Sequence, residues 1–184
     1  MIVIATMTFQ FANAQTKYGL KAGANFATFT GSDAKDLDML TAFYAGGFVN
    51  LEISDLISIQ PDVLFSAKGA KSTQAGIDFT SNVNYISVPV MLQLKFGSIY
   101  AEAGPQFGFL MSSEVSGGGV TLDAKDQTTS TDFGAAIGAG LKFENGLGIG
   151  ARYTMGFSST DDVGNSDIKN SVIGIGLSYT FGGN

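Results

Sequence analysis

The chain of 184 residues contains no cysteine and no histidine, and it has only three prolines. The absence of cysteine excludes disulfides and thiolate metal sites. The absence of histidine removes the commonest general base and the commonest metal ligand in proteins. A hydrolase built on a serine or aspartate nucleophile normally needs that base. We therefore expect a protein that is not an enzyme, with no cofactor and no metal site.

The sequence also lacks long apolar runs and basic patches. No run approaches the roughly 18 apolar residues that a membrane-spanning helix needs. The net charge is −6, and the segments 33–38, 114–126 and 161–169 each hold three carboxylates and one lysine. This distribution gives no basic footprint for nucleic acid. The 25 glycines also argue against a helical protein, because glycine inside a helix costs about 1 kcal/mol relative to alanine.

The stretch 132–157 shows what the chain has instead. Apolar residues alternate with small or charged ones, and this period of two is typical of a β-strand. Asn145-Gly146 interrupts the pattern, and this dipeptide favours the positive φ angles of a two-residue hairpin turn. Each arm has roughly the 9–11 residues that a tilted strand needs to cross a bilayer. The stretch is therefore predicted to be a membrane-spanning hairpin.

The same alternation recurs along the chain and separates short turns from longer polar segments. We expect the segments 30–38, 69–82, 112–131 and 158–170 to be loops, with a mobile tip at Gly117-Gly118-Gly119. Pro61 lacks a ladder donor, which predicts a local bulge in its strand. The predicted strands are 17–26, 43–53, 57–68, 85–96, 99–111, 132–144, 147–157 and 173–182.

Strands that follow one another without crossover helices pair antiparallel. Short turns that alternate with long loops are typical of an outer-membrane barrel, with short periplasmic turns and long external loops. The predicted fold is therefore all-β, an eight-stranded antiparallel up-and-down transmembrane β-barrel in the cell outer membrane. Both termini are then expected in the periplasm.

The first residues differ from the rest of the chain. They are apolar without a period of two, and Ala12-Asn13-Ala14 resembles a signal-peptidase site. We expect residues 1–14 to be a signal-peptide remnant and residues 15–184 to form the barrel domain.

The two faces of the predicted strands have different environments. We assign the large apolar residues to lipid, because the opposite face is mostly glycine and suits the narrow interior of an eight-stranded barrel. Charged residues of both signs on that inner face should pair. Lys17, Lys68 and Asp132 are among the inward positions. The predicted members of the interior ionic network are Lys21, Glu52, Asp62, Lys95, Glu102, Lys142, Glu144 and Arg152.

Aromatic residues gather near the ends of the predicted strands. Outer-membrane barrels carry two such girdles, one at each membrane–water interface. The predicted lipid-facing aromatics are Tyr18, Phe26, Phe43, Phe65, Phe96, Phe133, Phe143, Phe157, Tyr179 and Phe181.

Five segments carry a resemblance to a known family: YGLKAGANFATFTG, ISIQPDVLFSAKGAK, YISVPVMLQLKFG, YAEAGPQFGFL and IGIGLSYTFG. Together they resemble the outer membrane protein β-barrel family often called PorT-like, which is similar to the small OmpA and OmpX barrels. The resemblance implies an eight-stranded barrel in a Gram-negative outer membrane and no catalytic residues. Some members are linked to type IX secretion and gliding.

These observations predict a monomeric, non-enzymatic barrel with a structural or surface-interaction role through acidic extracellular loops. Its expected surroundings are membrane lipid and lipopolysaccharide, with protein partners at the loops or in secretion machinery. Three alternatives stay open: an accessory component of protein secretion or gliding, a small-solute channel, and a soluble lipocalin-like ligand-binding barrel. The last would turn its apolar face inward.

Overall fold

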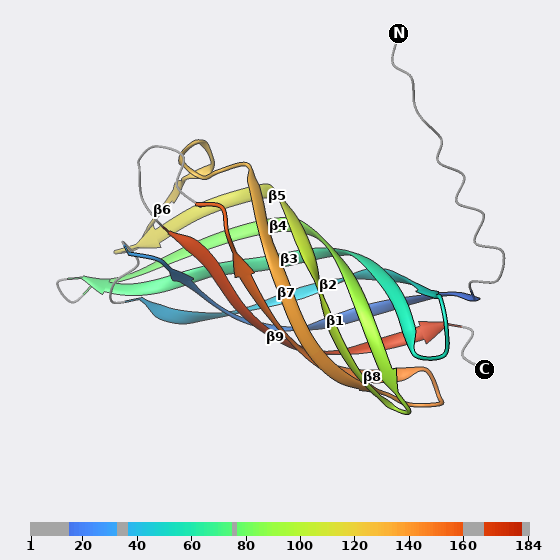
Figure 1. Ribbon diagram of the computed structural model, residues 1–184. Coiled ribbons are helices and arrows are strands. Elements are labelled where there is room, and N and C mark those ends of the chain that lie inside the picture. Colours follow the sequence, from blue (N-terminus) through green and yellow to red (C-terminus); the bar gives the residue numbers. More distant parts are fainter. Residues whose placement is uncertain (1–14, 33–36, 75–76, 160–167, 182–184) are drawn as a thin grey trace, which may run out of the picture.

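The computed structural model describes residues 15–32, 37–74, 77–159 and 168–181 (Figure 1). The predicted signal-peptide remnant lies outside these residues. No helix in the described part of the chain is long and apolar enough to span a membrane. The elements are β1 (Gln15–Thr30), β2 (Asp38–Glu52), β3 (Ile57–Gln74), β4 (Ile77–Phe96), β5 (Ile99–Gly117), β6 (Val120–Asp123), the short 3₁₀ helix η1 (Lys125–Gln127), β7 (Thr131–Lys142), β8 (Leu147–Gly156) and β9 (Lys169–Phe181).

Eight of the nine strands close into an antiparallel ring in the order β1-β2-β3-β4-β5-β7-β8-β9. The ring closes where β9 pairs with β1, from Tyr18 opposite Phe181 to Thr30 opposite Lys169. The remaining strand, β6, pairs with β5 outside the ring. The predicted eight-stranded up-and-down barrel is confirmed.

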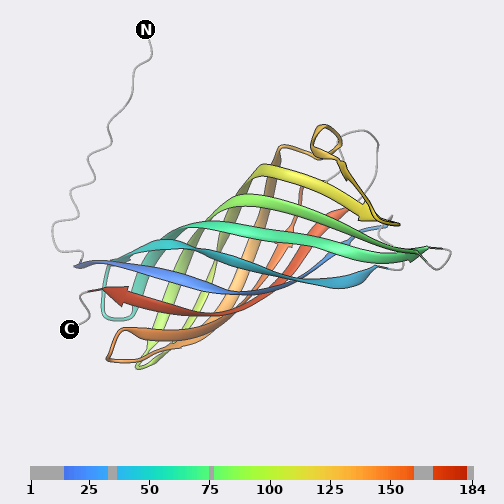
Figure 2. The same cartoon turned by 180° about the vertical axis from the view of Figure 1, so that it is seen from behind.

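The two ends of the barrel differ in their connections (Figures 1 and 2). β1 begins and β9 ends at the same end as the short turns that join β2 to β3, β4 to β5 and β7 to β8, which we call the turn end. Gly97 and Gly146 take φ angles of 62° and 84° in two of these turns. At the opposite end, which we call the loop end, β1 is followed by β2, β3 by β4, β5 by β6 and η1, and β8 by β9.

The barrel is apolar outside and polar inside. Leu20, Ile137 and Leu177 are 56%, 59% and 63% exposed on the outer surface. Gln60 and Gln93 are buried in the interior. A soluble lipocalin-like barrel needs the opposite arrangement, so that alternative is wrong. The exposed apolar exterior is a surface for lipid.

Glycine on the inner face lets strands and side chains approach closely. A Cβ at Gly176 of β9 would meet the Tyr44 hydroxyl and the backbone oxygen of Ala22. Gly176 therefore makes room for the Tyr44 ring, which extends into the lumen from β2.

Two predicted loops at the loop end are wrong. The segment 69–82 contains the continuation of β3 and β4, which pair from Gly69 opposite Asn82 to Gln74 opposite Ile77. The segment 112–131 contains the end of β5, then β6 and η1, and the glycines form the turn of a β5–β6 hairpin. Gly118 and Gly119 have φ angles of 59° and 84° there. These strands were missed because the extensions of β3 and β5 are mostly polar, with Lys71 to Gln74 and Ser112 to Glu114 as runs of polar residues.

The predicted bulge at Pro61 is also wrong. Pro61 pairs with Val90, and the register between β3 and β4 is the same on both sides of it. The missing N–H of proline instead accompanies a gap in the β2–β3 pairing, which resumes in register at Leu51 opposite Ile59. The register shifts lie elsewhere, between Met39 and Tyr44 of β2 and between Asn84 and Tyr85 of β4.

Candidate functional site

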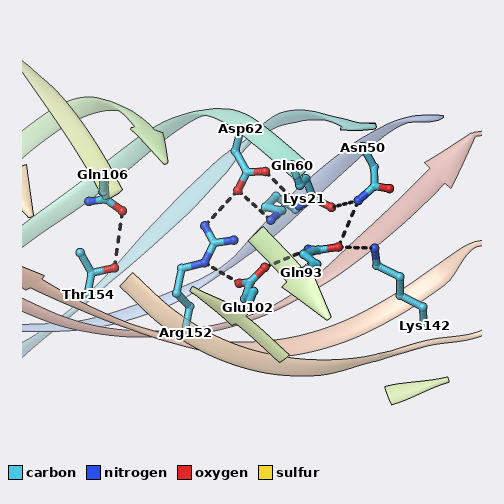
Figure 3. Close-up of polar contacts among 10 residues, drawn as sticks. All are labelled: Lys21, Asn50, Gln60, Asp62, Gln93, Glu102, Gln106, Lys142, Arg152 and Thr154. Atoms are coloured by element: carbon cyan, nitrogen blue, oxygen red, sulfur yellow. Dashed lines mark hydrogen bonds and ion pairs between the residues drawn. The ribbon is translucent and has the colours of Figure 1, made fainter. Parts of the chain in front are cut away.

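Four charged side chains meet in the middle of the lumen, and we call them the central cluster (Figure 3): Lys21 of β1, Asp62 of β3, Glu102 of β5 and Arg152 of β8. Asp62 Oδ2 lies 2.9 Å from Lys21 Nζ and 2.9 Å from Arg152 Nη1. Arg152 Nε donates to Glu102 Oε1 at 2.8 Å. Two cations and two carboxylates are thus balanced, and they connect four strands across the barrel.

The strands leave room for this cluster by placing glycine beside it. Arg152 stands opposite Gly138 on β7 and opposite Gly174 on β9. A Cβ at Gly138 would lie 3.0 Å from Glu102 Oε1. The guanidinium therefore occupies space that larger neighbours would fill.

Buried amides complete the hydrogen bonding of the two carboxylates. Gln60 donates to Asp62 Oδ1 at 3.0 Å, and Gln93 donates to Glu102 Oε2 at 2.9 Å. Asn50 links the two glutamines by donating to both side-chain oxygens at 3.1 Å. These amides were not predicted as members of the interior network, although each occupies an inner position of the alternation, which was the available signal.

A second ionic group lies toward the turn end, and we call it the mouth group: Lys17, Glu52, Lys95 and Lys142. Glu52 accepts from Lys95 at 2.7 Å and lies 3.2 Å from Lys17 Nζ. Lys142 Nζ donates to the neutral Gln93 Oε1 at 2.8 Å.

Glu144, predicted for the interior network, lies in the turn between β7 and β8 and is exposed. The inward face of β7 ends at Lys142, and Glu144 comes two residues later, after the strand has ended. Continuing the alternation past the end of the strand produced this error.

A third ionic group, a single ion pair, lies toward the loop end. Lys68 Nζ is 2.8 Å from Asp132 Oδ2, and the two side chains are 1% and 4% exposed. The same ammonium lies 4.8 Å from the centre of the Tyr85 ring. Lys68 and Asp132 thus join β3 to β7 inside the barrel.

The middle of the interior is filled by these side chains. The cavity beside the central cluster is only about 60 Å³. Side chains fill the interior of eight-stranded barrels, whereas open aqueous channels are found in barrels of 16 or more strands. Within the described residues, no group of three or more acidic side chains is placed to hold a metal ion.

The predicted lipid-facing aromatics lie toward both ends of the barrel. Phe133 packs on Phe107 and Phe157 toward the loop end, with ring centres 5.2 and 5.9 Å apart. Tyr179 packs on Phe181 at the turn end, at 5.4 Å. The exposed members are Tyr18, Phe43, Phe96, Phe133, Phe143, Phe157, Tyr179 and Phe181, whereas Phe26 and Phe65 are half-buried.

A second candidate site lies at the loop end (Figure 2). There β3, β4 and β5 continue beyond the last residue pair between β5 and β7, and β6 pairs with β5. We call residues 69–74, 77–84, 110–117 and 120–123 of these strands the projecting sheet. The pairing of β5 with β7 stops at Phe109 opposite Thr131. Within the described chain β6 pairs with β5 alone, and Val120 and Leu122 on it are 58% and 64% exposed. β6 is therefore an open edge.

A closed barrel with a polar, ion-paired interior and an apolar exterior defines an integral outer-membrane β-barrel protein. The family model for the outer membrane protein β-barrel domain matches residues 11–162, so the chain belongs to that family. The resemblance seen in the sequence is confirmed at this level.

Two solved structures show the same fold. Neisserial surface protein A is 14% identical, with a TM-score of 0.60 over 91% of this chain and 99% of that one. The attachment invasion locus protein Ail of Yersinia pestis is 18% identical, with a TM-score of 0.51 over 91% of this chain and 99% of that one. No curated protein sequence matches the chain.

Proposed function

We propose that this chain is a non-enzymatic outer-membrane protein whose projecting sheet binds another macromolecule at the cell surface. The observation that carries the proposal is the open edge of β6. The unpaired N–H and C=O groups of an edge strand are a template on which an extended segment of another protein adds as a further strand. β6 carries two exposed apolar residues, Val120 and Leu122, which would contact that segment.

The charges near this edge favour a basic partner. Glu114, Asp123 and Asp126 are exposed there, and Lys125 is the cation among them. Complementary charge steers association and suppresses wrong partners. The acidic loop end therefore selects a segment with lysine or arginine beside its extended part.

This function requires that the loop end faces outward and that the termini and short turns face the periplasm. The usual placement of short turns and long loops in outer-membrane barrels supports that orientation. The absence of cysteine allows a direct measurement with a membrane-impermeant maleimide on intact cells. We expect Asp126→Cys at the loop end to be labelled and Ser98→Cys at the turn end to be protected. The reverse pattern would refute the orientation.

The function is tested with three strains: wild type, a gene deletion, and a variant in which residues 114–123 are replaced by a short turn. Each strain is scored for binding to immobilised basic extracellular proteins and for resistance to detergent. We expect the shortened variant to bind as poorly as the deletion while it keeps detergent resistance. Equal binding by the wild type and the shortened variant would refute the proposal.

The same strains separate the alternatives. A secretion or gliding accessory would leave exported cargo in the periplasm of the deletion strain. A small-solute channel would give conductance in planar bilayers, which the filled lumen argues against. A purely structural barrel would lose detergent resistance in the deletion strain alone, with surface binding unaffected in all three.

A further inference from the structure

The turn end of the barrel contains a cavity of about 460 Å³ that no part of the proposed surface function uses. Its lining includes Lys17, Asn50, Glu52, Lys142 and Thr180. The volume falls within the roughly 300–1,000 Å³ that is usual for small-molecule sites. It is several times larger than the cavity beside the central cluster, which measures about 60 Å³.

The charges around this cavity are not balanced as they are in the central cluster. The central cluster has two cations for two carboxylates. The mouth group has three lysines, and Lys17 and Lys95 share the single carboxylate of Glu52. Glu144 is a second carboxylate in the lining of the cavity, which itself holds two lysines and two glutamates. Lys95 lies beside Glu52 outside that lining, so the mouth group and Glu144 together carry one positive charge in excess.

The excess charge is located at Lys142. Its ammonium donates to Gln93 Oε1, a neutral oxygen that also accepts from Asn50 at 3.1 Å and Ser58 at 3.4 Å. An ammonium group has three donors, and Gln93 takes one of them. The ammonium also lies 5.1 Å from the centre of the Tyr100 ring, which carries no negative charge. A partly buried cation without an acidic partner is unfavourable, and an anion in the adjoining cavity would relieve this cost.

We propose that the turn-end cavity binds a small oxyanion, a phosphate or carboxylate group, with Lys142 as the main ligand and Lys17 as the second. Both lysines line the same cavity, and hydrogen bonds between an ammonium and an oxyanion are among the stronger ones in proteins. The site lies at the opposite end of the barrel from the projecting sheet, so it is independent of the proposed surface function.

The test uses the full chain refolded in detergent micelles, with lysine side chains labelled for NMR. Inorganic phosphate is titrated at constant ionic strength, and sodium acetate is titrated in a parallel series. We expect saturable shifts at Lys142 and Lys17. Tighter binding of phosphate would identify a phosphate group as the ligand, and tighter binding of acetate would identify a carboxylate.

Variants locate the site. Lys142→Met should weaken phosphate binding by about tenfold or more, the effect of losing one charge-assisted contact. Lys71→Met is the matched control, because Lys71 is exposed on the projecting sheet at the other end. Lys17→Met provides a second measurement if Lys142→Met does not fold. Absence of saturable shifts in the wild type, or equal phosphate affinity in Lys71→Met and the lysine variants of the cavity, would overturn the proposal.

Discussion

β3 and β5 contribute residues to both the central cluster and the projecting sheet, yet the two regions differ in their sequence pattern. β3 carries Asp62, which is fully buried, and about ten residues later the same strand forms one side of the projecting sheet. Inside the barrel, lipid lies on one face and a narrow lumen on the other, so apolar and polar residues must alternate. Beyond the ring this demand is weaker, and polar residues occupy successive positions from Lys71 to Gln74 of β3 and from Ser112 to Glu114 of β5. The surroundings of a strand, more than its pairing, decide its sequence pattern.

The same difference predicts how the two regions respond to substitution. Removing one partner of a buried ion network leaves an uncompensated charge, which is expensive. Exposed positions away from such features change stability little. The following predictions test this contrast, beginning with the largest effect.

Arg152→Ala should lower the free energy of unfolding by about 3–5 kcal/mol, because it leaves Asp62 and Glu102 buried with one cation fewer. Reversible urea unfolding in lipid vesicles measures the change. Lys71→Ala on the projecting sheet is the control, and it should stay within about 0.5 kcal/mol of the wild type. Equal effects of the two substitutions would show that the central cluster does not stabilise the barrel.

Ile149→Arg should cost roughly 1–3 kcal/mol, because Ile149 lies on the outer face two residues from the start of β8, between the turn-end interface and the membrane midplane. Ile149 is exposed on the outer surface between Leu141 and Leu177 of the neighbouring strands. Urea unfolding in lipid vesicles measures the change in the free energy of unfolding, and Val120→Arg on β6 is the water-exposed control. A near-neutral result at Ile149 would contradict the assignment of this face to lipid.

Gly176→Val should cost about 1–3 kcal/mol through overpacking. The added side chain would meet the Tyr44 hydroxyl and the Ala22 backbone oxygen. The double variant with Tyr44→Ala should recover part of the loss, because it removes one of the two obstacles. Unchanged stability of Gly176→Val would show that Gly176 is not packed closely against Tyr44 and the backbone of β1.

Leu122→Lys should leave the free energy of unfolding within about 0.5 kcal/mol of the wild type, because its side chain is exposed. A lysine on an edge strand discourages pairing with another chain, so surface binding should fall. Thermal unfolding and the cell-binding assay measure the two effects. Retained binding together with unchanged stability would exclude the β6 edge as the contact surface.

Much of the barrel was predictable because the period of two extends through nearly every membrane-length strand. The inward positions of Lys21, Asp62, Glu102 and Arg152 follow from counting along that alternation. The errors fall near the ends of the membrane-length strands. Glu144 lies beyond the end of β7, and residues 69–74 continue β3 as a strand paired with β4, although Ala70 is the one apolar side chain among them. The bulge predicted at Pro61 was wrong because the missing N–H accompanies a gap in the pairing with β2 and leaves the pairing with β4 in register. Which strand lies on each side of Pro61 depends on the tertiary structure.

The sequence by itself determined the number of ring strands, their antiparallel order and which face of each strand is apolar, because lipid and a narrow lumen impose a local pattern. Only the tertiary structure decided which charges meet. The ion pairs join residues 41 to 90 positions apart in the central cluster, and ring closure and strand stagger set those distances. The open edge of β6 and the excess charge near Lys142 likewise depend on which neighbours the closed barrel supplies.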